Sequence, residues 1–394
     1  MRLGLWLPRL DHLRVLGPGA DAARKRGHEI HWMTPAFGGL KDTAYRYFRP
    51  WDGDRHAVPT GVREAVRAAR LLNVVAAVGL NVSAEVRNGG GVPWAALPYR
   101  QEELLAVLER GPAALAGWQL VTTASEAGLA CLPDQLRLRL RIIGDPILDP
   151  VPTLDRERIR ADMGLPAGQK VVFFATAARP ARLPRRWRWA FFDEGPGRWL
   201  TGSEINVRAW TGTSKGYSQV PDYRSTVDLI CRWANRHGAV LLASSRPKHR
   251  DPWWLDDYAE RDQPDRPPRY HPFRTLELLM AADAYVGFAS TLAVEATACG
   301  LQQRHLLAWP TELVERPAYL PLRRQFYEAE NGLWNGVLGA SYRLYERAGL
   351  GCFEAWAERC DFPKRVTIGG DMIASVLEPV AGQVGGASDR FLDI

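Results

Sequence analysis

The chain has 394 residues, which is too long for one ordinary hydrophobic core and suits two domains. Hydrophobic residues make up 46% and charged residues 24%, as in typical globular proteins, and no apolar run is long enough to span a membrane. Five scattered cysteines without a C-x-x-C pair argue against a disulfide framework and a zinc site. The net charge of +7 suits an anionic partner without identifying it, and the absence of a signal-peptide pattern predicts a cytoplasmic protein.

The first half of the chain alternates strand and helix patterns. Apolar runs predict strands over residues 3–7, 29–33, 71–80, 119–123 and 141–144, and helical periodicity predicts helices over 13–26, 61–70 and 101–116. The triplet Gly17-Pro18-Gly19 predicts a late or broken start for the first helix, whereas Gly27 is expected to end it. The near-continuous apolar run over 71–80 is typical of a strand buried on both faces of a sheet.

A proline-rich stretch, residues 145–152, separates the two halves and marks a domain boundary at 150. The second half repeats the alternation, with strands predicted over 170–175, 239–244, 284–288 and 304–309 and helices over 155–163, 223–237, 275–282 and 291–299. We therefore expect an α/β fold of two doubly wound Rossmann-type domains that face each other across a cleft. These domains are residues 1–150 and 151–375, and residues 376–394 form a C-terminal tail.

Residues 177–221 have no clear periodicity and are far longer than an ordinary strand-to-helix loop. The segment is rich in Arg and contains four Trp residues, which argues against plain disorder. Because Trp faces stack on sugar rings and Arg pairs with phosphates, we interpret it as a lid or an acceptor platform.

The strongest functional pattern lies at the junction of the predicted strand 284–288 and the helix that follows. Ser290 and Thr291 open this helix, whose free backbone N–H groups suit a diphosphate, and both hydroxyls can add hydrogen bonds. Glu295 lies one turn further along the same face, where a carboxylate can accept hydrogen bonds from ribose hydroxyls. The alternative is that Ser290 is only an N-cap and Glu295 only a surface residue.

A basic segment follows the strand predicted over 239–244. Arg246, Lys248 and His249 lie beyond its carboxyl end, and Arg250 adds a further charge. Such a cluster suits a diphosphate bound at the same edge of the sheet. The alternative is a solvated basic loop without a ligand.

The segment containing Ser290, Thr291 and Glu295 resembles the donor-site signature of GT-B-fold glycosyltransferases. Its S-T-x-x-x-E spacing is most similar to capsule and surface-polysaccharide transferases and to CDP-glycerol-type transferases. The resemblance implies that the Ser/Thr pair contacts the donor phosphates and that Glu295 holds the ribose. The basic segment resembles the Lys-x-His-Pro element of the polysaccharide transferases in a changed order. Residues 143–149 resemble the segment that enters the interdomain linker.

The N-terminal domain carries a second resemblance, which implies that it is the acceptor domain and that the C-terminal domain is the nucleotide-donor domain. His12 and His28 are sixteen residues apart, as in many GT-B glycosyltransferases in which the first histidine deprotonates the acceptor hydroxyl. A neutral imidazole suits that task at cellular pH. Asp11 and Val15 depart from the family pattern at the neighbouring positions. Asp11 is an alternative base or orients His12, and His28 is expected to be structural.

These patterns together predict a glycosyltransferase that moves a sugar from a nucleotide-diphosphate or CMP donor to an acceptor hydroxyl. We expect an inverting mechanism with no metal and no cofactor. A CDP-glycerol-type glycerophosphotransferase and a sugar-nucleotide 2-epimerase are alternatives on the same fold, and a nucleic-acid-binding protein is the alternative from another class. The expected partner is a nucleotide sugar rather than a nucleic acid. The acceptor is left open between a small natural product, a glycan and a lipid-linked molecule reached by peripheral membrane contact.

Overall fold

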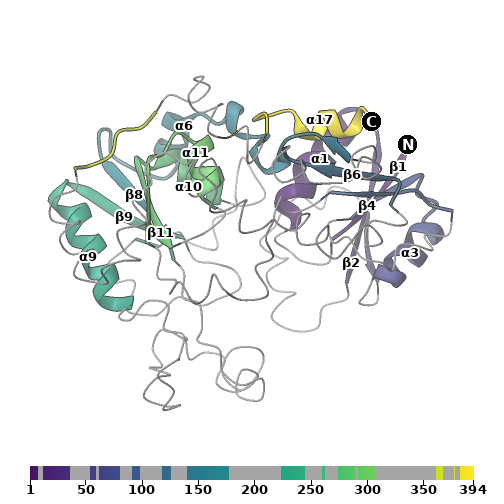
Figure 1. Ribbon diagram of the computed structural model, residues 1–394, viewed down its shortest axis with the longest axis horizontal. Coiled ribbons are helices and arrows are strands. Elements are labelled where there is room, and N and C mark those ends of the chain that lie inside the picture. The colour runs from purple at the N-terminus through teal and green to yellow at the C-terminus, as the bar shows by residue number, and fades with distance from the viewer. Residues whose placement is uncertain are drawn as a thin grey trace, which may run out of the picture.

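The computed structural model describes fourteen parts of the chain, and its elements fall into two lobes, each built on one parallel sheet (Figure 1). The described residues are 1–7, 12–35, 54–58, 62–79, 91–97, 118–125, 140–176, 223–244, 260–261, 274–288, 292–306, 361–366, 377 and 382–394. The predicted helix over 101–116 and the Arg/Trp-rich segment 177–221 lie outside them.

The N-terminal sheet has seven strands in the order β3-β2-β1-β4-β5-β6-β7, and all its described pairs are parallel. The strands are β1 (Arg2–Trp6), β2 (Glu29–Pro35), β3 (Asp54–Val58), β4 (Ala76–Gly79), β5 (Trp94–Ala96), β6 (Leu120–Thr123) and β7 (Leu140–Ile142), and the helices are α1 (Leu13–Lys25) and α3 (Val62–Leu71). The order reverses between β1 and β4, so the topological switch point of this sheet lies there.

The C-terminal sheet has five strands in the order β10-β9-β8-β11-β12 and is also parallel. The strands are β8 (Lys170–Ala175), β9 (Ala239–Ser244), β10 (Glu260–Arg261), β11 (Ala284–Phe288) and β12 (Gln303–Leu306), and the helices are α6 (Arg156–Asp162), α9 (Tyr223–Arg236), α10 (Thr275–Ala281) and α11 (Leu292–Ala298). Here the order reverses between β8 and β11. The strands predicted over 170–175, 239–244 and 284–288 are confirmed to the residue.

Two elements differ from the expectation in ways that packing explains. Helix α1 begins at Leu13 and runs through Pro18, because the apolar face that includes Leu16 and Ala20 is buried and outweighs one missing backbone hydrogen bond. The apolar run over 71–80 is mostly not a strand. Its first residue belongs to α3, a turn with Asn73 at φ 50° follows, and only Ala76–Gly79 joins the sheet.

The short linker between the two sheets is anchored in both cores. The 3-10 helix η4 (Pro146–Leu148) is capped by Asp145, whose carboxylate accepts from the Ile147 backbone N–H at 3.0 Å. Ile147 is completely buried in one of the core clusters of the N-terminal half, whereas Leu148 is completely buried in a core cluster of the C-terminal half. A second turn, η5 (Val151–Thr153), leads to α6.

The end of the chain returns to the N-terminal lobe. Helix α17 (Ala387–Leu392) packs against α1 and η4 (Figure 1). The Asp149 carboxylate accepts from the first two backbone N–H groups of α17, at 2.6 and 2.7 Å, and Arg26 pairs with Asp389 and Asp393 at 2.9 and 2.6 Å. This helix lies within the tail predicted over 376–394.

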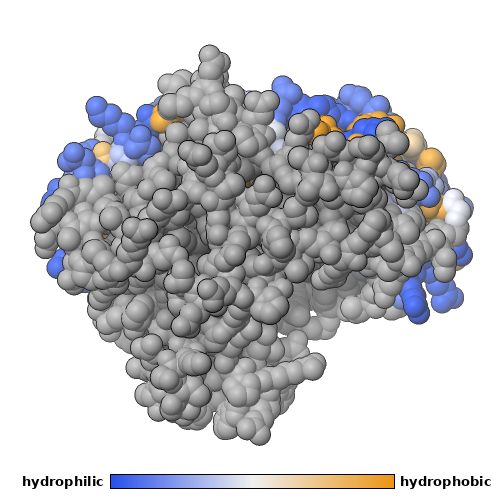
Figure 2. Space-filling model, in the orientation of Figure 1, coloured by the Kyte–Doolittle hydropathy of each residue, from blue (hydrophilic) through white to orange (hydrophobic). Residues whose placement is uncertain are grey.

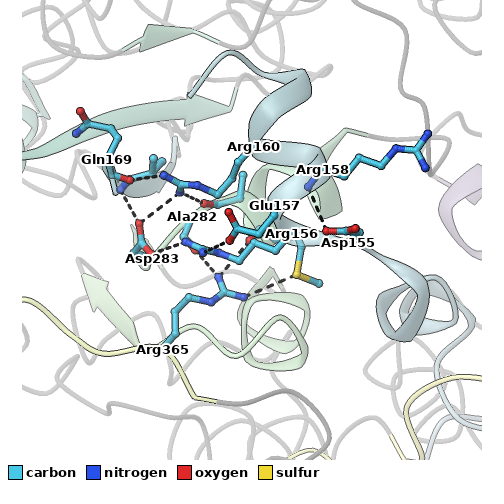
Figure 3. A network of polar contacts seen from close by, with 12 residues as sticks. Asp155, Arg156, Glu157, Arg158, Arg160, Gln169, Ala282, Asp283 and Arg365 are labelled. Atoms are coloured by element: carbon cyan, nitrogen blue, oxygen red, sulfur yellow. Dashed lines mark hydrogen bonds and ion pairs between the residues drawn. The ribbon is translucent and has the colours of Figure 1, made fainter. Parts of the chain in front are cut away.

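A polar network closes the amino end of the C-terminal sheet (Figure 3). Asp283 precedes β11 and binds Arg156 of α6 at 2.6 Å, with Arg160 of the same helix at 3.7 Å. Arg365 donates to the backbone carbonyls of Met280, Ala282 and Cys299, which end α10 and α11. Arg365 thus satisfies carbonyls that the helix ends leave without intrahelical partners.

The described surface is mostly hydrophilic in the view of Figure 2, with apolar spots scattered among polar side chains. Its large exposed apolar residues are Met1, Leu71, Val75, Ile142 and Ile394. Within the described part of the chain, no helix combines the length and the apolar character that crossing a membrane requires.

Candidate functional site

The two topological switch points single out the segments that follow β1 and β11. Ligands of open parallel sheets bind beyond the carboxyl ends of the strands where the order reverses. His12 lies in the segment after β1, and Glu295 lies in α11, the helix that follows β11. The sequence patterns and the sheet topology therefore point to the same two places.

Both of these predicted residues are buried. His12 begins α1 as its N-cap residue and has 0% exposure, as does Glu295. The interpretation of Glu295 as a surface residue is therefore wrong, because it points inward from a helix whose residues 293–298 are all buried.

Arg14 and Glu295 form a buried ion pair that joins the two halves of the molecule. A guanidinium nitrogen of Arg14 in α1 donates to Oε2 of Glu295 in α11, across 281 residues of sequence. Arg14 is only 8% exposed. Removing one partner of such a pair costs about 3–5 kcal/mol, since it leaves an uncompensated buried charge. The contact therefore strongly favours an arrangement in which the segment after β1 meets the helix after β11.

Arg14 does not stand out as a site residue in the sequence patterns. The only available signal is its position two residues after His12, inside the otherwise apolar run Leu13–Leu16. A charged residue that is flanked on both sides by buried apolar residues needs a buried partner. That partner could not be found from local sequence, because it lies in the other half of the chain.

The other predicted site residues lie outside the described residues. They are Asp11, Arg246, Lys248, His249, Ser290 and Thr291. The strands that precede these segments are described: β9 ends at Ser244 and β11 ends at Phe288, with β8 between them in the sheet. Because the strands are parallel, the basic segment and the Ser290-Thr291 segment both start from the same edge of the sheet.

Cys299 follows α11 but has no chemical role that the structure supports. Complete burial raises the pKa of its thiol to about 12, with Arg365 opposing the effect in part. Since the thiolate is the nucleophilic form, this cysteine is inert at neutral pH. Among the described residues, no three His, Cys, Asp or Glu side chains gather in a way that could hold a metal ion.

Comparisons with known proteins agree on the architecture. No protein-family model matches the sequence, and no curated protein matches it significantly. Among solved structures, the UDP-GlcNAc 2-epimerase from Methanocaldococcus jannaschii is similar, with 12% identity and a TM-score of 0.54 over 100% of this chain and 99% of that one. The UDP-GlcNAc 2-epimerase from Neisseria meningitidis bound to UDP-GlcNAc has 10% identity and a TM-score of 0.53 over 100% and 99%.

The wall teichoic acid polymerase TagF is similar to the same degree, with 10% identity and a TM-score of 0.53 over 100% of this chain and 87% of that one. At these identities the likeness shows the fold alone. The chain has the GT-B fold, a mixed α/β architecture with two Rossmann-like halves built on parallel sheets, as the sequence patterns predicted.

Proposed function

We propose that this protein is a glycosyltransferase that moves a sugar from a nucleotide-activated donor to an acceptor hydroxyl. The observation that carries the proposal is the buried contact between Arg14 and Glu295. It joins the segment predicted to activate the acceptor to the helix predicted to bind the donor. A transferase needs both substrates at one place, and this contact supports that arrangement.

In the proposed reaction, His12 accepts the proton of the acceptor hydroxyl. The acceptor oxygen then forms a bond to the anomeric carbon as the bond from that carbon to the donor phosphate breaks. The phosphate leaves with the electron pair, with inversion at the sugar. Ser290, Thr291 and the basic side chains of Arg246 and Lys248 would stabilise the departing negative charge without a metal ion.

The burial of His12 adds a requirement to this mechanism. An imidazole with no exposed surface cannot meet an acceptor hydroxyl, so the acceptor must enter through a more open arrangement of the surrounding segments. Because the proposed donor-binding residues belong to the C-terminal half, we expect donor binding and sugar transfer to be separable by mutation at His12.

The first experiment is a thermal-shift screen with UDP, CDP, GDP, CMP, TDP and UDP-GlcNAc. A ligand at a hundred times its Kd adds about 2.7 kcal/mol of stability, so a true donor nucleotide raises Tm clearly. His12→Ala should keep this stabilisation but lose transfer by about 100-fold or more. His28→Ala is the matched control and should keep both. If the His12→Ala variant transfers the sugar at the wild-type rate, His12 is not the base.

The reaction product distinguishes a glycosyltransferase from the alternative enzymes. A 2-epimerase converts the nucleotide sugar to its epimer without any acceptor, and a glycerophosphotransferase releases CMP from CDP-glycerol. Binding of single-stranded oligonucleotides with a steep salt dependence, and of no nucleotide sugar, would instead support the nucleic-acid-binding alternative.

A further inference from the structure

Helix α3 carries a row of arginines on its exposed face. Arg63, Arg67 and Arg70 follow one another at spacings of four and three residues, so they lie on one side of the helix, and all three are exposed. The other side, which includes Ala65, is buried in the core cluster that contains Trp6. Because the core holds α3 in place, the arginines present a fixed row of positive charge on the outer side of the N-terminal lobe (Figure 1).

The stability of the helix does not account for this row. Like charges four residues apart weaken a helix, and a cation in the first turn, as at Arg63, opposes the helix dipole. Within the described part of the chain, the three arginines make no ion pair or hydrogen bond, and the half-buried Glu64 is the single acidic residue of α3. By contrast, the exposed Arg232 of α9 pairs with Asp228 at 2.9 Å. The charges of the row are therefore open to an anionic partner.

Two exposed aliphatic side chains lie where α3 ends. Leu71, its last residue, is 76% exposed, and Val75, which follows the turn that leads to β4, is 56% exposed. The backbone N–H of Val75 donates to the carbonyl of Arg2 at 2.9 Å, which fixes Val75 at the amino edge of the sheet. Surfaces that bind anionic lipid combine these two components: basic side chains attract the headgroups, and apolar side chains enter the boundary between headgroups and acyl chains.

The chemistry of these side chains favours a lipid bilayer over a nucleic acid. Proteins that bind single strands without sequence preference stack the bases on aromatic rings. The large exposed apolar residues of the described part of the chain include no aromatic side chain. Leu71 and Val75 offer a base no ring to stack on, whereas their aliphatic surface is removed from water when it enters a bilayer interface.

We propose that the exposed face of α3, formed by Arg63, Arg67 and Arg70 with Leu71 and Val75 at its end, docks the protein on an anionic lipid surface. This face lies on the side of the N-terminal lobe away from the C-terminal lobe (Figure 1). Docking therefore does not involve the segments at which the two halves meet. The inference is independent of the proposed function, because none of these residues is assigned to the donor or to the acceptor.

The test is co-sedimentation of the full chain with lipid vesicles. Wild type should bind vesicles of phosphatidylcholine and phosphatidylglycerol in equal parts, less tightly as salt is added, and should not bind pure phosphatidylcholine. The triple variant Arg63→Gln/Arg67→Gln/Arg70→Gln should bind the anionic vesicles about 100-fold more weakly, because three charges near the lipid surface are lost. All three side chains are exposed, so circular dichroism should show a folded protein with the wild-type Tm.

The matched control removes the same charge from the other half. Arg158, Arg232 and Arg236 are exposed residues of α6 and α9, and their triple replacement by Gln should keep vesicle affinity within about threefold of wild type, since screening limits attraction over long distances. The variant Leu71→Gln/Val75→Thr keeps every charge and removes aliphatic surface. Its vesicle affinity should fall about tenfold.

The outcomes decide between the partners. Wild-type vesicle affinity in the α3 triple variant overturns the proposal, as does an equal loss in the control or an unchanged affinity in Leu71→Gln/Val75→Thr. If wild type ignores the vesicles but binds an oligonucleotide through the same arginines, the face binds nucleic acid and not lipid. The nucleotide screen reports on the proposed function separately, because all these variants should keep the wild-type response to nucleotides.

Discussion

At the scale of single residues, the Asp283 carboxylate links several elements of the C-terminal half. It sits between two arginines of α6 and also accepts from the backbone N–H of Val171 at 2.9 Å, so it joins α6, β8 and β11 (Figure 3). The Asp283 carboxylate therefore faces the positive charges of both Arg156 and Arg160.

We expect Asp283→Ala to lower the free energy of unfolding by about 3 kcal/mol, because it leaves the buried Arg160 guanidinium without its carboxylate partner and Arg156 with only the exposed Glu157. Urea denaturation monitored by circular dichroism measures the loss. Glu157→Ala is the control, since Glu157 pairs with the same Arg156 at 3.0 Å but is 79% exposed at its side chain. Its effect should be within about 0.5 kcal/mol of zero. Equal losses in the two variants would contradict the buried role of Asp283.

At the scale of elements, the sequence predicted strands well where they are long and apolar and poorly where they are short or polar. Strands β8, β9 and β11 were predicted with their exact bounds, because five or six mostly buried residues give a clear pattern. Strand β5 has three residues and β10 has two, so neither was predicted. Packing decides these short elements, since neighbouring strands supply their hydrogen bonds.

The candidate site was predictable only in its separate pieces. His12 and Glu295 stand out locally because each follows an apolar strand at a helix start. Their proximity through Arg14 was not predictable, since it depends on how the two sheets are placed relative to one another. Helix α17 was likewise not predictable, because six residues without a long apolar pattern do not show that Asp149 caps them.

The returning C-terminal segment approaches the N-terminal lobe closely at Gly382. Gly382 has φ 65°, and a Cβ atom there would collide with the carbonyl oxygen of Ala124 and lie 3.3 Å from Cα of Gly144. Both the backbone conformation and the close approach therefore exclude a side chain.

We expect Gly382→Ala to destabilise the docked C-terminal segment by about 1–3 kcal/mol through overpacking, with backbone strain in addition. Hydrogen exchange should accelerate in α17 and in the α1 residues that it covers, while β8 and β9 keep their protection. Gly19→Ala is the control, because Gly19 lies in α1 with open space around its Cα and should not loosen α17. Unchanged exchange in α17 would mean that the segment can dock without this glycine.

At the scale of the whole molecule, the two halves have separate cores that meet at adjacent residues of the linker. Ile147 belongs to the cluster that contains Leu13 and Leu16, and Leu148 to the cluster that contains Val171 and Phe173. If these cores are energetically distinct, a cavity on one side of the linker loosens one half more than the other.

We therefore predict that substitutions of two neighbouring linker residues accelerate hydrogen exchange in different halves of the molecule. Ile147→Ala and Leu148→Ala should each cost about 2–5 kcal/mol, since each removes a completely buried aliphatic side chain. Hydrogen exchange should rise mainly in β1 and α1 for Ile147→Ala, and mainly in β8 and α11 for Leu148→Ala. Identical hydrogen-exchange patterns in both variants would show instead that the two sheets unfold as one cooperative unit. In that case the Arg14–Glu295 pair would couple the stabilities of the two halves as well as their positions.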